Sequence, residues 1–253
     1  MPPDSWSLSR DLLFRFCPRA YWLRYRGPRD PWGRVSLPLK KLDSPEIRRL
    51  REDGLRAAFY AHLDDAEALQ VRQVCRQAIF RQAAAITGAT AASEWAEVLL
   101  DESGDALEAL SDSADLAQLR LLPPGRFLRQ EQIAIPVGDF SAFSRLDGRW
   151  AEQGKWKLLQ VGCGGPHRWR LALAELWAAT KGLARFGEAE LAWFDLETGR
   201  LEWCGSSSEA AQQIRERVLV GAPLFLSNDE ADYPLCAELD KCLGCPWRQT
   251  CGR

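Results

Sequence analysis

Apolar side chains recur every three or four residues near the start of the chain, and this spacing predicts a helix. The helix covers the stretch RDLLFRFCPRAYWLRY from Arg10, with Ser9 as its N-cap, and Pro18 marks a break or the start of a second helix. After a loop rich in Gly, Pro and Asp, helical spacing resumes behind Ser44 and Pro45. The further helices are expected at about 45–63, 66–87, 92–100 and 104–119.

The pattern changes to alternation after the segment PPGR at 123–126. Three successive strands are predicted at 127–137, 140–150 and 155–161, followed by a helix over 168–186 that ends before Gly187. A hairpin over 189–204 has Gly199 at its turn, and a last helix covers 207–220. Helices, a strand meander, a helix, a hairpin and a helix together predict an α/β chain with one central mixed sheet flanked by helices.

Charge is balanced over the whole chain but not along it. The 33 basic and 35 acidic residues provide no overall attraction for polyanions. Residues 10–56 carry 13 basic against 6 acidic side chains, whereas residues 57–120 carry 4 against 11. This asymmetry permits a basic face for nucleic acid beside an acidic helical lobe, although solvated helix surfaces give similar runs.

Apolar runs long enough to span a bilayer are missing, as is the pattern of a signal peptide. We therefore expect a cytoplasmic protein without a membrane partner. In a reducing compartment, clustered cysteines indicate metal binding or catalysis before disulfides, and this chain has eight cysteines.

The tail CLGCPWRQTCGR contains three of these cysteines, Cys242, Cys245 and Cys251, in a C-x2-C-x5-C pattern. Three thiolates on a short loop can bind one metal centre, which then needs a fourth ligand. If Cys236 is that ligand, the tail forms a local knuckle that suits zinc. If Cys17 is that ligand, the metal joins the two ends of the chain. The spacing leaves both arrangements open, beside the alternative of thiols that bind nothing.

The stretch SLSRDLLFRFCPRAYWLRY, paired with CLGCPWRQTCGR, resembles the iron–sulfur branch of the PD-(D/E)XK nuclease superfamily. That branch includes RecB-like exonucleases, CRISPR-associated adaptation nucleases and AddB-type helicase-nuclease subunits. The resemblance implies a restriction-endonuclease-like α/β core with a helical lobe, and a [4Fe-4S] cluster that joins the two terminal segments, with zinc as the alternative metal. The implied cluster ligands are Cys17, Cys242, Cys245 and Cys251, and the implied single domain, 1–253, divides into a cluster helix (1–35), a helical lobe (36–122), a nuclease-like core (123–225) and an iron–sulfur segment (226–253).

The same resemblance places the family's catalytic motifs on the predicted strands and helices, but this chain lacks the catalytic residues. FSAFSRLDGRW is similar to a strand ending G-x-x-D-R-x-D, LLQVGCGG to V-D-Y-K-T-G, and RLALAEL to the helix with Q-x-x-x-Y. A G-x-x-x-H histidine aligned on Gly54 falls on an alanine. The positions expected to be catalytic are thus Ser144, Val161, Cys163, Arg170, Ala174 and Ala58.

These substitutions predict a catalytically inactive protein, because Mg²⁺ requires carboxylate oxygens and the reaction requires Mg²⁺. The leading hypothesis is a pseudo-nuclease that binds nucleic acid or assembles a complex in DNA processing or defence. One alternative is an active exonuclease with relocated carboxylates at Glu131, Asp147 and Glu175. The other is a structural or interaction protein with a zinc knuckle.

Candidate contacts to nucleic acid are basic residues that alternate with aromatic ones near the N-terminus, where they can bind phosphates and stack on bases. The alternative is that the aromatic side chains are core and the arginines face water. A second basic spot follows the glycine turn near 164–165, and the resembling families suggest a protein partner such as a nuclease, a helicase or an integrase-like subunit. The candidate residues are Arg10, Arg15, Arg19, Arg24, His167, Arg168 and Arg170.

Overall fold

The computed structural model describes residues 6–26, 44–122, 127–225, 230–235, 245 and 251. The chain forms two compact units. Unit 1 consists of Met1–Lys40, Ala134–Ser144 and Gln212–Arg253, and unit 2 consists of Lys41–Ile133 and Arg145–Ala211. Three elements, β2 (Leu128–Val137), β3 (Phe140–Glu152) and α9 (Ser208–Leu224), contribute residues to both units.

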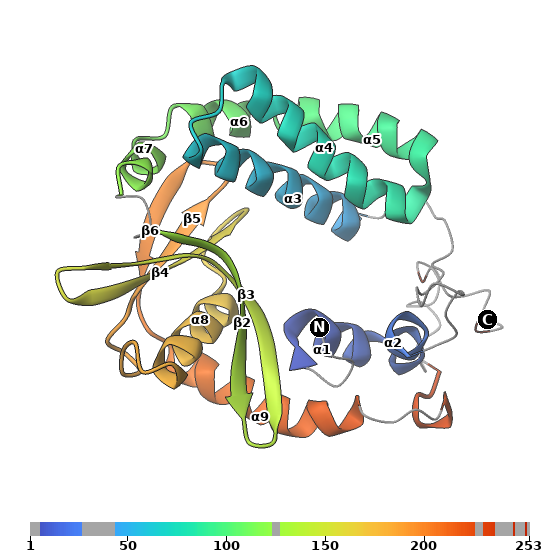
Figure 1. The fold of residues 1–253 in the computed structure, drawn as a ribbon. Coiled ribbons are helices and arrows are strands. Elements are labelled where there is room, and N and C mark those ends of the chain that lie inside the picture. The colour runs from blue at the N-terminus through green and yellow to red at the C-terminus, as the bar shows by residue number, and fades with distance from the viewer. Residues whose placement is uncertain are drawn as a thin grey trace. The chain divides into compact units, whose positions relative to one another are not determined.

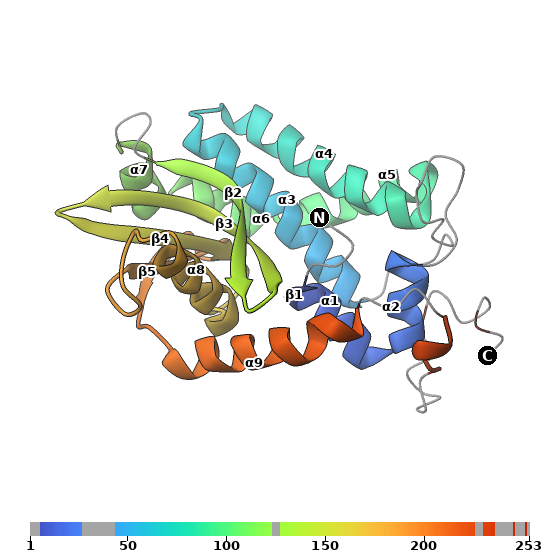
Figure 2. The same cartoon turned by 60° about the horizontal axis from the view of Figure 1, so that its bottom comes forward.

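Unit 2 begins with the helices predicted from the apolar spacing: α3 (Ser44–Leu63), α4 (Ala68–Thr87), α5 (Ala89–Glu102), α6 (Gly104–Ser111) and α7 (Ala114–Arg120). In α4 the buried residues follow a four-residue spacing from Val71 to Ala83, and both views show α4 alongside α3 and α5 (Figures 1 and 2). The predicted helix over 104–119 is two helices. The break occurs because Ser113 caps α7, its Oγ accepting the N–H of Leu116 at 3.0 Å.

The sheet of unit 2 is mixed, as predicted. Its strands run in the order β3, β4 (Lys155–Gly162), β5 (Glu190–Asp195) and β6 (Arg200–Cys204), and β2 pairs with β3. The β3–β4 and β5–β6 pairs are antiparallel, whereas β4 and β5 are parallel (Figure 1). The parallel pair requires a crossover, and α8 (Arg168–Thr180) provides it.

Alternation along the strands divides the side chains between two cores. Leu159 and Val161 of β4 and Phe194 of β5 pack into the cluster that includes the buried faces of α3 to α7. On the opposite face, Leu158 and Leu191 are buried on the side of α8, in which every residue from 171 to 178 is buried. The sheet therefore lies between the helical lobe and α8.

The predicted end of the helix over 168–186 is wrong. The helix stops at Thr180 because Gly182 takes a left-handed conformation (φ +66°) and the N–H of Leu183 donates to the Ala178 carbonyl, which closes the helix. The predicted hairpin is confirmed: Gly199, also at φ +66°, lies between β5 and β6.

Unit 1 contains β1 (Trp6–Ser7), α1 (Leu8–Phe16), α2 (Pro18–Tyr25), most of α9 and a short 3-10 helix, η1 (Glu230–Asp232). The predicted cap at Ser9 is wrong, because Ser7 is the N-cap and its Oγ accepts the N–H of Arg10. The second helix predicted at Pro18 is confirmed. Cys17 separates the two helices with an extended backbone (φ −159°).

The core of unit 1 is aromatic. The ring of Tyr21 lies 4.8 Å from that of Phe225, 5.6 Å from Phe14 and 6.0 Å from Tyr233, measured between centroids. Of the aromatic residues predicted either as core or as stacking platforms, Tyr21 is thus fully buried core, and Phe14 packs against it while partly buried.

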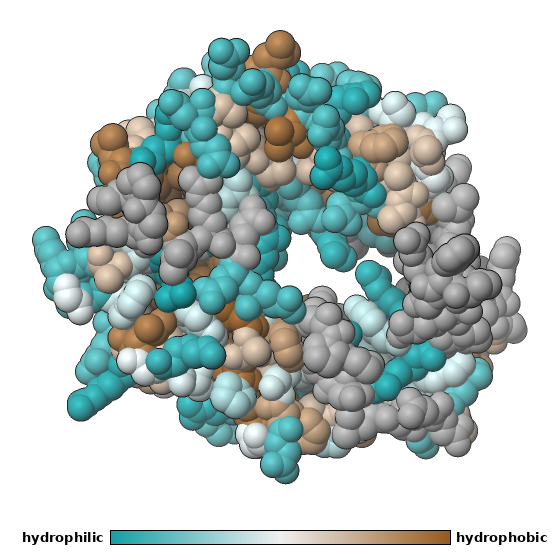
Figure 3. Space-filling view, viewed as in Figure 1, coloured by the Kyte–Doolittle hydropathy of each residue, from teal (hydrophilic) through white to brown (hydrophobic). Residues whose placement is uncertain are grey.

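Hydrophilic residues predominate on the surface view in Figure 3, with hydrophobic residues scattered between them. Among the described helices, none has the length and apolar character that a membrane span requires.

Candidate functional site

The candidate site lies in unit 2 where β3 and β4 diverge. Their pairing runs from Glu152 opposite Lys155 to Gly148 opposite Leu159. Beyond that pair, a side chain joins the strands: Oδ2 of Asp147 accepts the N–H of Val161 at 2.9 Å. Asp147 therefore lies beside the end of β4, where the resemblance placed the predicted catalytic positions Val161 and Cys163.

Helix α3 presents three residues to this end of β4. Glu52, Arg56 and Tyr60 follow one another at four-residue spacing, so they share one face of the helix. The Tyr60 hydroxyl donates to Oδ1 of Asp147 at 2.9 Å. Burial raises the pKa of Tyr60, and the Asp147 charge raises that pKa further, so the phenol remains a donor.

Arg56 is the central cation of the site. Its Nη2 donates to Oε1 of Glu52 and to the carbonyl of Val161, both at 2.6 Å, and its Nε lies 3.4 Å from Oδ1 of Asp147. The Arg56 side chain is only 9% exposed. Burial alone would lower the pKa of Arg56, but Asp147 and Glu52 outweigh that effect and raise it, so the guanidinium stays charged.

Arg170 of α8 completes the network from the other side. Its Nη1 donates to Oε1 of Glu52 at 3.0 Å and to the Val161 carbonyl at 3.3 Å. Burial on its own would raise the pKa of Glu52, but Arg170 and Arg56 together lower it. Arg145 adds a third guanidinium, with Nε 3.4 Å from Oδ1 of Asp147. Arginine, tyrosine and amide donors thus surround both carboxylates. The Arg56 network is defined as the following residues: Glu52, Arg56, Tyr60, Arg145, Asp147 and Arg170.

The positions predicted to have lost catalytic groups carry no replacement for them. Val161, Ala174 and Ala58 are fully buried core residues, and Ser144 is half-buried on the part of β3 that belongs to unit 1. Burial, followed by the charges of Glu52 and Glu197, raises the pKa of Cys163 to about 12, so this thiol is protonated at neutral pH and does not supply the positive charge of a lysine.

The relocated carboxylates proposed from sequence have separate partners. Oε2 of Glu131 accepts from Nε of Arg149 at 3.0 Å, and Asp147 belongs to the Arg56 network. Glu175 is buried and accepts from the N–H of Gly187 at 2.7 Å and from the Ser206 hydroxyl at 2.8 Å. Within the described residues, no group of three or more His, Cys, Asp or Glu side chains is arranged to hold a metal ion.

The N-terminal arginines mostly bind other parts of unit 1. Arg10 is buried with its guanidinium 4.7 Å from the centroid of the Tyr25 ring, and Arg24 lies 5.7 Å from the same ring. Arg19 donates to the Tyr233 carbonyl at 2.8 Å and pairs with Glu230. Arg15 pairs with Asp11 at 2.9 Å but stays half exposed, so it is the N-terminal arginine with most access to solvent.

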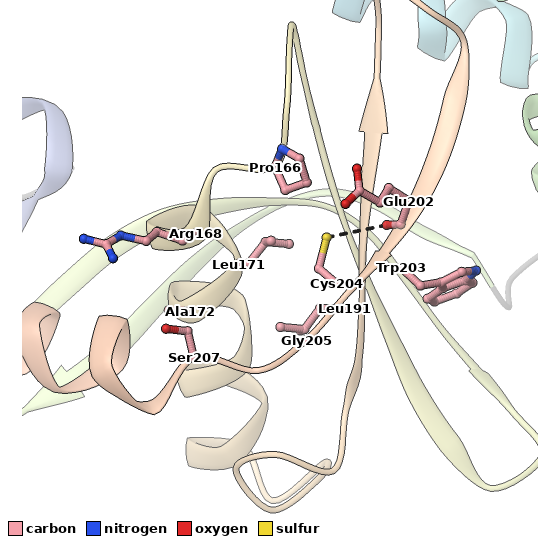
Figure 4. A pocket seen from close by; sticks show the side chains of 10 residues that line it. All are labelled: Pro166, Arg168, Leu171, Ala172, Leu191, Glu202, Trp203, Cys204, Gly205 and Ser207. Atoms are coloured by element: carbon pink, nitrogen blue, oxygen red, sulfur yellow. Dashed lines mark hydrogen bonds between the residues drawn. The ribbon is translucent and has the colours of Figure 1, made fainter.

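The predicted second basic spot, His167, Arg168 and Arg170, does not form one cluster of side chains. Arg170 is engaged in the Arg56 network, whereas Arg168 is exposed and lines a separate cavity of about 250 Å³ between α8 and β6. Figure 4 shows Arg168 directed away from Cys204, whose thiol donates to the Glu202 carbonyl at 3.6 Å. His167 is exposed at the N-cap of α8. The structure therefore does not bring the three side chains together as one phosphate site.

Three of the predicted cluster cysteines belong to one small apolar cluster in unit 1. Cys17 is buried with Ala20 and Leu23, and Cys245 and Cys251 pack against them. The Sγ of Cys17 accepts the N–H of Ala20 at 3.4 Å at the start of α2. The remaining candidate ligands, Cys236 and Cys242, lie outside the described residues.

Sequence reasoning missed Glu52, Arg56 and Tyr60. Their only signal is the spacing E-x-x-x-R-x-x-x-Y, which also describes an ordinary solvated helix face.

Comparison with known proteins gives little beyond this. No family model matches the chain, and no curated protein sequence matches it. Among solved structures, "Crystal structure of SSO0001", a Sulfolobus protein, is 11% identical over 81% of this chain and 84% of its own, with a TM-score of 0.32. A likeness at this level shows neither a family nor a function.

Proposed function

We propose that the chain is a catalytically inactive iron–sulfur protein of the PD-(D/E)XK type that serves as a nucleic-acid-binding or complex-assembly subunit in DNA processing or defence. The observation that carries the inactive assignment is the state of Asp147. This acid of β3 faces the C-terminal end of β4, and its two oxygens accept from Tyr60 and from the Val161 N–H.

The chemistry of phosphodiester cleavage with Mg²⁺ explains why this arrangement is inactive. The ion needs open carboxylate oxygens, and it activates water and neutralises charge on the phosphate. Here Glu52 and Asp147 already neutralise Arg56 and Arg170. A divalent cation that bound both carboxylates would have to displace the guanidinium groups of Arg56, Arg170 and Arg145, so the network disfavours Mg²⁺ binding.

The support for a metal centre in unit 1 is the kind of donor present there, since the described side chains form no group arranged to hold an ion. Cys17, Cys245 and Cys251 offer soft sulfur donors, which suit iron–sulfur clusters and zinc. The amide of Ala20, which donates to Cys17 Sγ, would stabilise a thiolate there. When bound, a [4Fe-4S] cluster would supply a cross-link between the termini, and Cys242 would be its fourth ligand.

Nucleic-acid binding rests on the cations that the internal network leaves accessible. Arg145 is 45% exposed at the rim of the Arg56 network, and Arg168 and Arg15 are exposed elsewhere. Such groups can hold backbone phosphates without cutting them. A protein partner such as a nuclease, a helicase or an integrase-like subunit would then supply the chemistry.

Metal analysis tests the iron–sulfur part. Anaerobically purified protein is expected to contain iron and acid-labile sulfide and to absorb visible light, and Cys17→Ala is expected to lose both. Cys204→Ala is the control, because Cys204 lies in unit 2, where its thiol donates to the Glu202 carbonyl. Zinc without sulfide, retained in Cys17→Ala, would support a local knuckle instead. Protein without any metal would refute both.

A nuclease assay tests the inactive part. The purified protein is expected to leave single- and double-stranded DNA intact with Mg²⁺ or Mn²⁺. Cleavage that copurifies with the protein and disappears in Asp147→Asn or Glu131→Gln would refute the proposal and favour relocated carboxylates. Filter binding of labelled DNA at increasing salt concentration tests the proposed binding of nucleic acid.

A further inference from the structure

The helical lobe of unit 2 contains a second cavity, far in sequence from the strands of the Arg56 network. It has a volume of about 460 Å³ and lies between the end of α3, the start of α4 and one side of α6. Pockets of this size commonly hold small ligands or single side chains. Its lining mixes one imidazole, charged groups and a short apolar wall.

His62 provides the anchor of this cavity. It lines the cavity and yet is only 9% exposed, so it is one of the few buried polar side chains of the unit. Burial, and to a lesser degree Arg120, lowers the pKa of His62, and the ring is therefore neutral at pH 7 with one donor and one acceptor. Neither ring nitrogen bonds to any residue that the structure describes, and neither is among its fully buried unpaired atoms, so both are accessible to a ligand in the cavity.

The charges around His62 favour a cation. Asp105, Glu108 and Asp112 line the cavity from α6 and its C-cap, against one arginine, Arg72 of α4. Within the described part of the chain, none of these four side chains has an ion-pair partner. The lining therefore carries a net charge of about −2, in a segment that is itself strongly acidic, and its field attracts positive groups.

An organic cation fits better than a metal ion. The described residues include no group of three His, Cys, Asp or Glu side chains close enough to coordinate a metal, and this cavity is larger than one ion needs. Val71 and Leu107 form an apolar wall that suits the methylene chain of lysine or arginine. Ammonium and guanidinium groups can donate to several carboxylates at once.

The rim indicates where the cation comes from. Leu69 follows the lining residue Ala68 on α4 and is 78% exposed, the second most exposed large apolar side chain among the described residues. A free small molecule in the cavity would leave Leu69 in water, whereas a peptide chain could cover it. We propose that this cavity receives a lysine or arginine side chain of a protein partner, with the carboxylates of α6 binding the charged group and His62 accepting one of its hydrogen bonds.

The chain offers a direct readout, because it contains only two histidines, His62 and His167. The probe is a nine-residue peptide with one central lysine flanked by leucines, titrated into the full-length protein while ring signals of both histidines are followed by NMR. We expect the His62 signals to shift and those of His167 to stay. A peptide with glutamine in place of the lysine should bind about tenfold more weakly.

Matched variants locate the effect. Glu108→Gln with Asp112→Asn removes two exposed carboxylates of the lining and is expected to lower the peptide affinity about tenfold. Asp101→Asn with Glu102→Gln removes the same charge from α5, outside the lining, and is expected to leave the affinity within about twofold. Both pairs are exposed, so neither should impair folding.

Three results would overturn the inference. His62 signals that ignore the lysine peptide would show that the cavity binds no such side chain. Spermidine that binds as tightly as the peptide would show that a small polyamine suffices and that the rim adds nothing. Equal losses in the two double variants would mean that general charge, not the cavity, attracts the peptide.

Discussion

Replacement of Arg56 by methionine is the most direct test of the site. Methionine keeps the length and apolar stem of the side chain but removes the guanidinium that joins α3, β3 and β4. The change leaves the Val161 carbonyl with Arg170 alone and leaves buried Asp147 without its nearest internal cation. Removal of one partner from a buried ion pair destabilises a protein by about 3–5 kcal/mol, and we expect Arg56→Met to fall in this range.

Arg49 provides the control on the same helix. It also faces Asp53, at 4.0 Å, but its side chain is 68% exposed. Exposed pairs contribute about 0–1 kcal/mol, so Arg49→Met should cost less than about 1 kcal/mol. Urea unfolding followed by far-UV circular dichroism measures both variants under one set of conditions, with the unfolding midpoint and slope compared to those of the parent protein.

A third variant separates charge from packing. If Arg56→Met lowers stability because it leaves the buried Asp147 carboxylate without a cation, the double variant Arg56→Met with Asp147→Asn should be more stable than Arg56→Met, since the unpaired charge is also removed. Equal effects of Arg56→Met and Arg49→Met would refute the view that the buried network holds the end of β4 to β3 and α3.

Three further predictions concern the same region. Arg170 and Arg56 depress the folded-state pKa of Glu52, so the ionised Glu52 stabilises the fold above its unfolded-state pKa, and this stability is lost as the pH falls through the folded-state pKa. As the pH decreases below about 4.5, the urea midpoint of Glu52→Gln should therefore fall less steeply than that of the parent protein. Parallel plots of midpoint against pH would contradict this. A Cβ on Gly162 would lie 2.6 Å from the Trp193 ring, so Gly162→Ala should cost about 1–3 kcal/mol in the same assay, whereas Gly165→Ala, with open space around it, should stay within about 0.5 kcal/mol. If exposed Arg168 binds a phosphate, Arg168→Gln should weaken DNA binding and reduce the slope of log affinity against log salt by about one, and exposed Arg48→Gln on α3 should do neither.

Local sequence signals determined the elements because each has its own physical marker. Apolar periodicity located α3 to α5, Gly199 located the hairpin, and Pro18 located the start of α2. The mixed sheet follows from the helix between β4 and β5, because neighbouring parallel strands need a crossover connection and a helix commonly provides it. Errors occurred at ends, where a competing cap decides: Ser7 replaces Ser9, and Gly182 stops α8 early.

The site could not be predicted in the same way. Arg56 and Val161 are 105 positions apart, and the residues between them decide whether an arginine on α3 faces water or a strand end. The signs of the charges in α3 indicate only a polar helix face. Arg170 illustrates the same limit: placed in a basic spot with Arg168, it turns toward Glu52, because a half-buried carboxylate offers a stronger partner than solvent does.

These contacts also predict that introducing the charged residues of the resembling motifs would not create a nuclease. Val161 is fully buried in the apolar cluster that includes Leu159, Phe194 and residues of α3, so Val161→Asp would bury a carboxylate among apolar side chains. Its carbonyl and the neighbouring Glu52 would remain bound to Arg56 and Arg170. We therefore expect Val161→Asp with Cys163→Lys to lower the unfolding midpoint in urea and to show no cleavage of DNA with Mg²⁺. Stable, active protein from those two changes alone would show that the arginines yield to a metal ion and that the network around the strand does not prevent cleavage.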